Sequence, residues 1–124
     1  MLTAKQHWTI SRLAYWYLDR GRAAEAEKLA RGMLALDQHD GQGWLYYGES
    51  RLQQEDLGEA VRGFQQAAQL LGDQPELWMR LGDVLLRLGR VDEARQALQK
   101  GRGQVGEGVL RQRIEALLRR CRAI

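Results

Sequence analysis

The sequence is poor in residues that support covalent or metal-based chemistry. Its 124 residues include one cysteine, one proline and two histidines, and asparagine is absent. A single cysteine, Cys121, excludes an internal disulfide and a cysteine-based metal site. Neighbouring arginines would favour a reactive thiol there, but the simpler interpretation is an ordinary residue at a helix end. His7 and His39 have no partner at metal-ligand spacing and are interpreted as surface residues.

Long apolar runs and strand-like alternation are also absent. No apolar run approaches the roughly 18 residues that span a bilayer, and no charged-then-apolar leader opens the sequence. We therefore expect no membrane insertion and a cytoplasmic location. Apolar residues make up 44% of the chain with charges interspersed, and no stretch alternates β-branched residues as a strand would. The composition predicts one all-α domain over residues 1–124.

Motifs that would indicate an enzyme fail on their context. The glycines at 101, 103 and 106 have the spacing of a dinucleotide-binding loop, but no strand precedes them. No nucleophile, acid–base pair or metal-ligand set can be assembled from the remaining residues. We therefore expect a protein that is not an enzyme and that uses no cofactor and no metal.

What the sequence does contain is a pattern that recurs after 34 residues. The recurring pairs are Trp44 and Trp78, Gly48 and Gly82, and Ala60 and Ala94. Ala14 and Ala26 continue the pattern towards the N-terminus in weaker form. Such a period is typical of stacked helical hairpins. The small residues are expected to face each other where two helices approach, and each tryptophan, one turn earlier, to lie between the same helices.

The pattern also predicts where the helices begin and end. Gly21, Gly41, Gly72 and Gly89 mark helix ends, and Pro75 suits the first turn of a helix. Helices are expected at about 3–19, 23–36, 42–54, 57–71, 75–88, 91–102 and 107–122. They form three hairpins in repeats of about 7–40, 41–74 and 75–108, followed by a capping helix at about 107–122. Its apolar residues should pack on the last repeat: Val109, Leu110, Ile114, Leu117 and Leu118.

This pattern resembles the tetratricopeptide repeat. The second repeat matches the family pattern at Trp44, Gly48, Ala60, Phe64 and Ala67, and the third at Trp78, Leu81, Gly82 and Ala94. Arg51 and Leu85 stand where tyrosine is usual, and the proline that ends each repeat is missing. The resemblance implies a right-handed α–α superhelix whose first helices line a groove for a protein or peptide partner.

Groove positions carried over from the family give a set of candidate binding residues: Trp8, Arg12, Tyr15, Leu45, Tyr46, Glu49, Met79, Arg80, Asp83 and Arg87. Aromatic residues, methionine and arginine are favoured at interface hot spots. A bound segment is expected to lay its apolar side chains on Trp8, Tyr15, Leu45, Tyr46 and Met79. Leu18, Leu52 and Leu86 occupy groove positions too, but are equally well interpreted as core.

An aromatic cluster sets the first repeat apart. Trp8, Tyr15, Trp16 and Tyr17 lie on one expected helix. Their spacing brings three of them towards one side, which predicts that some are core. One helix face cannot bury all four, because adjacent residues point about 100° apart. The cluster is therefore expected to leave aromatic surface exposed.

The net charge of +3 is concentrated at the C-terminal end. Residues 106–124 contain five arginines against two glutamates, which accounts for the whole excess. A nucleic-acid contact through these arginines (Arg111, Arg113, Arg119, Arg120 and Arg122) is one reading, but the segment lacks interleaved aromatic residues and any recognisable binding module. A solvated capping helix explains the same residues more simply.

Among small proteins of this repeat, the chain resembles the type III secretion chaperones. The grounds are its length, three repeats with a capping helix, and an opening helix that leads into Tyr17 and Gly21. The resemblance implies a non-enzymatic chaperone or adaptor whose partner is a secretion substrate or an export component. Two alternatives remain open: a self-associating scaffold or homodimer that uses Trp8, Trp16 and Tyr17, and the nucleic-acid contact through the arginines.

Overall fold

The structure is a computed structural model that describes residues 1–123, and within these residues it contains seven α-helices and no strand. The helices are α1 (Ala4–Asp19), α2 (Ala23–Leu36), α3 (Gly41–Gln53), α4 (Leu57–Leu71), α5 (Pro75–Arg87), α6 (Val91–Arg102) and α7 (Val109–Ala123). The predicted all-α fold is confirmed, and every predicted helix is present with closely matching ends. None of these helices combines the length and the apolar character needed to cross a membrane.

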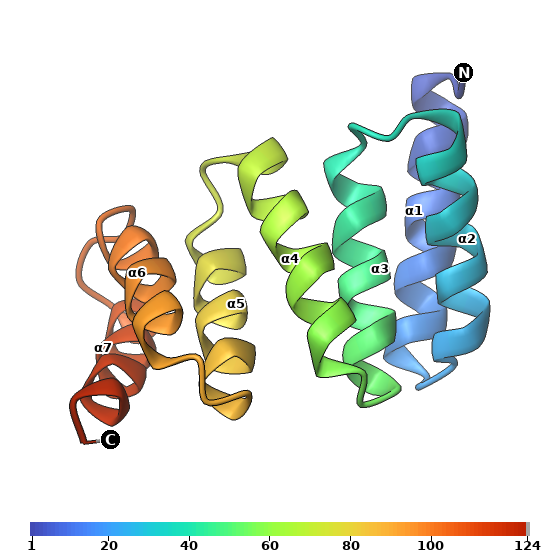
Figure 1. Ribbon diagram of the computed structural model, residues 1–124. Helices are drawn as coiled ribbons and strands as arrows, with labels where there is room; N and C mark the ends of the chain where they lie inside the picture. The colour runs from blue at the N-terminus through green and yellow to red at the C-terminus, as the bar shows by residue number, and fades with distance from the viewer. Residues whose placement is uncertain (124) are drawn as a thin grey trace. The chain divides into compact units, whose positions relative to one another are not determined.

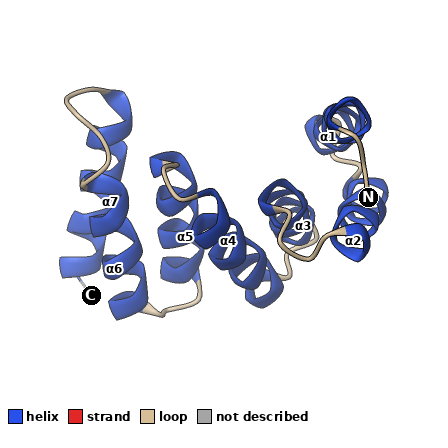
Figure 2. Cartoon of the chain, turned by 90° about the horizontal axis from the view of Figure 1, so that it is seen from above, coloured by secondary structure: helices blue, strands red, loops and turns tan. Residues whose placement is uncertain are grey.

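The chain forms two compact units. The first, Met1–Leu71, contains the hairpins α1–α2 and α3–α4, and α3 packs against both α4 and α2 (Figures 1 and 2). The second unit begins at Gly72 and contains the hairpin α5–α6 together with α7, which packs on both of these helices. Three antiparallel hairpins and a final single helix are therefore present as predicted.

The first helix of each hairpin ends in the same way. The amide of Gly21 donates to the Leu18 carbonyl (3.0 Å), and the next amide donates to the Tyr17 carbonyl (2.8 Å). The same pair of hydrogen bonds recurs around Glu55 and Gly89. This arrangement satisfies the last carbonyls of the helix and requires a left-handed turn residue. The φ angles of the three turn residues are 70°, 61° and 76°.

The core repeats with the sequence pattern. Two positions on the second helix of every hairpin are 0% exposed. The first position is occupied by Ala26, Ala60 and Ala94, and the second by Ala30, Phe64 and Leu98. The expected contact between small residues needs correction, however. A Cβ on Gly63 would lie 2.6 Å from the Gly48 Cα, and a Cβ on Gly48 would meet Phe64 first, so Gly48 faces Gly63 and Phe64 rather than Ala60.

The two repeated tryptophans have a second role besides packing. The Trp44 indole Nε1 donates to the Gln38 carbonyl (2.8 Å), and 34 residues later Trp78 Nε1 donates to the Gly72 carbonyl (3.2 Å). Trp78 also lies against α6, as predicted, because a Cβ on Gly101 would meet the Trp78 Cβ at 3.1 Å. Each tryptophan therefore fixes the loop before its own helix in addition to its contact with the second helix.

The helix α7 is held by one apolar face. Ile114, Leu118 and Cys121 are 0%, 8% and 2% exposed, so the Cys121 thiol belongs to the core of the second unit. The prediction that Val109 packs on the last repeat is wrong, because this side chain is 72% exposed. Val109 precedes Ile114 by five residues, which rotates it about 140° away from the buried face.

Candidate functional site

In the first unit, α1 and α3 border an open hollow of about 550 Å³. Its walls are formed by Ala4, His7, Trp8, Ser11, Arg12, Tyr15, Gln42 and Tyr46, and we call it the aromatic hollow. Trp8 and Tyr15 are 64% and 61% exposed. Four of the ten candidate binding residues (Trp8, Arg12, Tyr15 and Tyr46) are thus brought together in one accessible depression.

The aromatic residues of α1 are exposed because this helix is covered on one side only. Ala14 is its single buried residue, and it faces the neighbouring helices α2 and α3. The prediction that part of the aromatic cluster is core is therefore wrong: Trp16 is 41% exposed, and Tyr17 is half-buried. A capping box at Thr3 and Gln6 fixes the start of α1, which offsets the sparse packing of the helix.

Arginine side chains lie over the exposed aromatic rings. The Arg12 guanidinium is 5.6 Å from the centre of the Trp8 ring, and that of Arg20 is 4.0 Å from the centre of the Trp16 ring. Such cation–π contacts hold a long side chain against the surface while its N–H groups remain available to a ligand. Arg12 therefore places a positive charge at the wall of the aromatic hollow.

His7, which lines the hollow, has an unexpected partner in Asp40. Their Nε2 and Oδ2 atoms are 2.8 Å apart, and the second carboxylate oxygen accepts the amides of Gln42 (3.1 Å) and Gly43 (3.2 Å). Asp40 thus caps α3 and contacts α1 at once. Of the two predicted surface histidines, His39 is exposed as expected, whereas His7 is only partly exposed because it contacts Asp40. An aspartate directly before a helix was the available signal, since this residue is preferred as an N-cap.

The floor of the hollow carries polar groups from both helices. Burial raises the pKa of Tyr46, so its hydroxyl stays protonated and can donate a hydrogen bond. The nearby Ser11 hydroxyl lowers the pKa of Tyr46 in part. Ser11 Oγ is itself buried and makes no well-aligned hydrogen bond to any of residues 1–123. The Tyr46 hydroxyl can pair with a bound peptide, because the peptide backbone supplies both donors and acceptors.

Two tetratricopeptide repeat models match this sequence, one over residues 51–121 and the other over residues 12–75. The chain belongs to the tetratricopeptide repeat family. A search of curated proteins found none that matches it.

Several solved structures share the fold over nearly the whole chain. The type III secretion translocator chaperone SycD of Yersinia enterocolitica is 18% identical with a TM-score of 0.89, over 99% of this chain and 88% of that one. SycD in complex with a peptide of the translocator YopD is 18% identical with a TM-score of 0.86, over 98% and 95%. PcrH, a protein of Pseudomonas aeruginosa, in complex with the chaperone-binding region of PopD is 20% identical with a TM-score of 0.87, over 98% and 95%. At this identity the likeness establishes the fold.

The other candidate residues lie outside the aromatic hollow. On α3, Leu45 and Glu49 are half-buried. In the second unit, Asp83 and Arg87 form an ion pair of 3.2 Å along α5, and Arg80 is half-buried.

Met79 does not offer the accessible surface expected of a binding residue, because it is 5% exposed. Leu86 is 8% exposed and is likewise core. The helix α5 buries seven of its residues, so its apolar side chains are used in packing. Within residues 1–123, no group of three or more His, Cys, Asp or Glu side chains could hold a metal ion.

Proposed function

We propose that this protein is a non-enzymatic chaperone of the type III secretion class that acts in the cytoplasm. On this proposal it binds a segment of a secreted translocator, or of an export component, and covers the apolar residues of that segment until export. The fold supports the proposal, since structures of this fold include SycD with a YopD peptide and PcrH with the chaperone-binding region of PopD.

The observation that carries the proposal is the aromatic hollow. Trp8 and Tyr15 are more than half exposed, and exposed aromatic side chains that face a depression are typical of protein-binding surfaces. Arg12 and the Tyr46 hydroxyl add polar groups that can orient a peptide backbone. A segment with bulky apolar residues would therefore bind through its side chains to the rings and through its backbone to these polar groups.

The proposal is tested in two steps. First, the protein is purified from its native host, and proteins that co-purify are identified by mass spectrometry. Second, the affinity of the recovered partner is measured for Trp8→Ala and Tyr46→Ala, and each change is expected to weaken binding about 10–30-fold. Leu88→Ala is the matched control, because it removes an exposed apolar side chain (38% exposed) at the C-cap of α5, in the second unit.

Two results would contradict the proposal. Recovery of no stable protein partner would argue against a chaperone, and unchanged affinity of both hollow variants would remove the hollow as the binding site. Circular dichroism of each variant separates lost binding from lost folding.

A second candidate function is self-association through the same exposed aromatic residues. Trp8 and Trp16 are 64% and 41% exposed on one helix, and apolar surface of this kind is also used between identical subunits. A homodimer would bury Trp16, which lies outside the residues that line the hollow. Sedimentation equilibrium distinguishes the two functions: a monomer at high micromolar concentration excludes the homodimer, and Trp16→Ala should dissociate it if it forms.

A further inference from the structure

A second surface, distant in sequence from the aromatic hollow, lies on α7. Val109, Arg113, Ala116, Arg120 and Ala123 follow one another at spacings of four, three, four and three residues, so they form one row along the helix. Val109 is 72% exposed, Ala116 is partly exposed, and the other three are exposed. We call this row, with its flanking residue Arg119, the α7 ridge.

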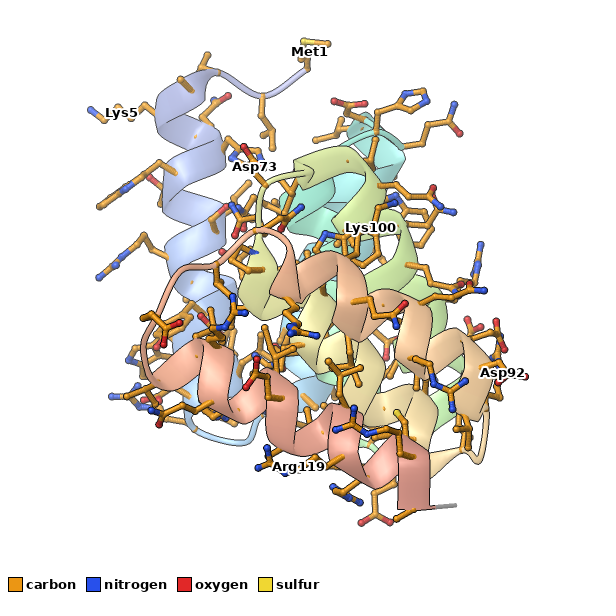
Figure 3. The ribbon with its side chains drawn as sticks, turned by 90° about the vertical axis from the view of Figure 1, so that its left-hand side faces the viewer. Met1, Lys5, Asp73, Asp92, Lys100 and Arg119 are labelled. Carbon is orange, nitrogen blue, oxygen red and sulfur yellow. The ribbon has the colours of Figure 1, made fainter. Side chains whose placement is uncertain are left out.

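The arginines of the α7 ridge form no ion pair with an acidic residue among residues 1–123. The one carboxylate on α7, that of Glu115, is shared by Arg111 (3.3 Å) and by Arg102 of α6 (3.4 Å). No ion pair within residues 1–123 involves Arg113, Arg119, Arg120 or Arg122. Figure 3, in which α7 lies in front, shows Arg119 on this helix. The helix therefore presents an excess of positive charge to solvent.

The ridge is free to bind because α7 is held by its other side. Ile114, Leu118 and Cys121 are buried, and the ion pair between Arg102 and Glu115 ties α7 to α6. No element of residues 1–123 covers the ridge, since all of its members remain at least partly exposed. A ligand can therefore bind there without displacing any part of the second unit.

We propose that the α7 ridge is a docking surface for an amphipathic helix of a partner protein that carries acidic residues beside its apolar face. Charge complementarity requires the acidic residues, because none of the three arginines of the ridge (Arg113, Arg119 and Arg120) forms an ion pair within residues 1–123. The helical form follows from the row itself: Ala116 lies between Arg113 and Arg120, and a small residue there lets a second helix approach closely. This proposal concerns a surface other than the aromatic hollow and does not depend on the chaperone function.

A nucleic-acid partner fits the same residues less well. Surfaces that bind nucleic acids combine cations with aromatic residues that stack on bases or with a known binding module. The helix α7 contains no aromatic residue, and small or apolar residues alternate with arginine along its exposed row. Such alternation supplies apolar contact area that a phosphate backbone would leave unused.

The test uses the full-length protein and three probes. The first is a synthetic amphipathic helix of about 20 residues with alanine and leucine on one face and glutamate beside it. The second is the same peptide with lysine in place of glutamate, and the third is duplex DNA of similar length. We expect the acidic peptide alone to bind, with an affinity that falls as salt rises, because exposed charges are screened.

Three variants distinguish binding at the ridge from a general effect of net charge. Arg113→Glu with Arg120→Glu should weaken binding of the acidic peptide at least about tenfold. The matched control, Lys5→Glu with Lys28→Glu, changes the net charge by the same amount at two exposed residues of the first unit and should leave binding nearly unchanged. Ala116→Gln keeps every arginine but adds bulk to the row, and should weaken peptide binding about tenfold. Circular dichroism checks that each variant remains folded.

Each of three results would overturn the proposal. Equal loss of binding in the arginine and lysine variants would mean that only net charge matters. Unchanged binding in Ala116→Gln would exclude a packed helix on the row. DNA that binds more tightly than the acidic peptide, and loses affinity in the arginine variant, would identify the ridge as a nucleic-acid surface instead.

Discussion

The residue at the turn of each hairpin shows how one side chain can strain the backbone of a repeated fold. Gly21, Glu55 and Gly89 occupy equivalent turns and all have φ between 61° and 76°. Glycine adopts this left-handed conformation without penalty, whereas a residue with a Cβ pays about 1–2 kcal/mol. Glu55 is the only residue other than glycine with a positive φ in the described part of the chain. The turn between α3 and α4 is therefore the strained member of the three.

Replacing this glutamate should stabilise the protein. Glu55→Gly relieves the left-handed strain, and the greater freedom of glycine in the unfolded chain offsets part of the gain. We expect the free energy of unfolding to rise by about 0.5–1 kcal/mol, measured by urea denaturation. Gly89→Glu is the converse change and should destabilise the protein. A less stable Glu55→Gly variant would mean that the Glu55 side chain makes a compensating contact.

At the scale of helices, a polar cluster joins α2 to α3 on the surface of the first unit. Glu27 of α2 accepts hydrogen bonds from Arg31 (2.7 Å), Arg51 (3.2 Å) and Gln54 (2.9 Å). Burial alone would raise the pKa of Glu27, but the hydrogen bonds from Gln54 and Arg31 and the charge of Arg51 lower it overall. The folded state therefore stabilises the charged form of the Glu27 carboxylate relative to its protonated form.

This cluster makes stability depend on pH. Because the folded state lowers the pKa of Glu27 below its ordinary value of 4.5, its contribution is complete above that pH and is lost as the pH falls through the folded-state pKa. Glu27→Gln should lower the free energy of unfolding by about 1–2 kcal/mol at neutral pH. The difference from the wild type should shrink as the pH falls below 4.5. Glu107→Gln, at an exposed loop residue, is the control; a difference independent of pH would contradict the assignment.

Helices and hairpins could be predicted from the sequence because their signals are local. The glycines at 21, 72 and 89 and the proline at 75 fix helix ends within a few residues of chain, and small residues at a period of 34 indicate paired helices. Individual contacts between helices carry no such signal. His7 meets Asp40 across 33 residues, and Gly63 has no glycine counterpart in the next repeat, where Ala97 stands.

The candidate site was predictable to the extent that it lies on one helix face. Trp8, Arg12 and Tyr15 follow each other at helical spacing, and all three line the aromatic hollow. Met79 occupies a groove position of the repeat pattern on α5 but is buried. Periodicity identifies a face of a helix, whereas the packing of neighbouring elements decides whether that face is covered. That information is absent from the repeat pattern itself.

At the scale of the whole molecule, the two compact units have separate buried cores. The first contains Phe64 and Met33, and the second contains Leu85, Leu98 and Ile114, all less than 2% exposed. In repeat proteins each hairpin contacts only its neighbours, so damage to one repeat is expected to spread over a limited distance. Local stability should then differ along the chain in a way that hydrogen exchange can resolve.

A pair of glycine substitutions tests this locality. A Cβ on Gly63 would lie 2.6 Å and 2.7 Å from backbone atoms of Gly48, so Gly63→Ala must push α4 away from α3 and should cost about 2–3 kcal/mol. Gly32→Ala is the matched control, because nothing lies within 4 Å of its Cβ position and alanine in a helix interior should stabilise α2 by about 0.5–1 kcal/mol. Native-state hydrogen exchange should show the largest loss of protection for Gly63→Ala in α3 and α4, with the amides of α6 nearly unchanged. An equal loss in all seven helices would instead mean that the chain unfolds as one cooperative unit.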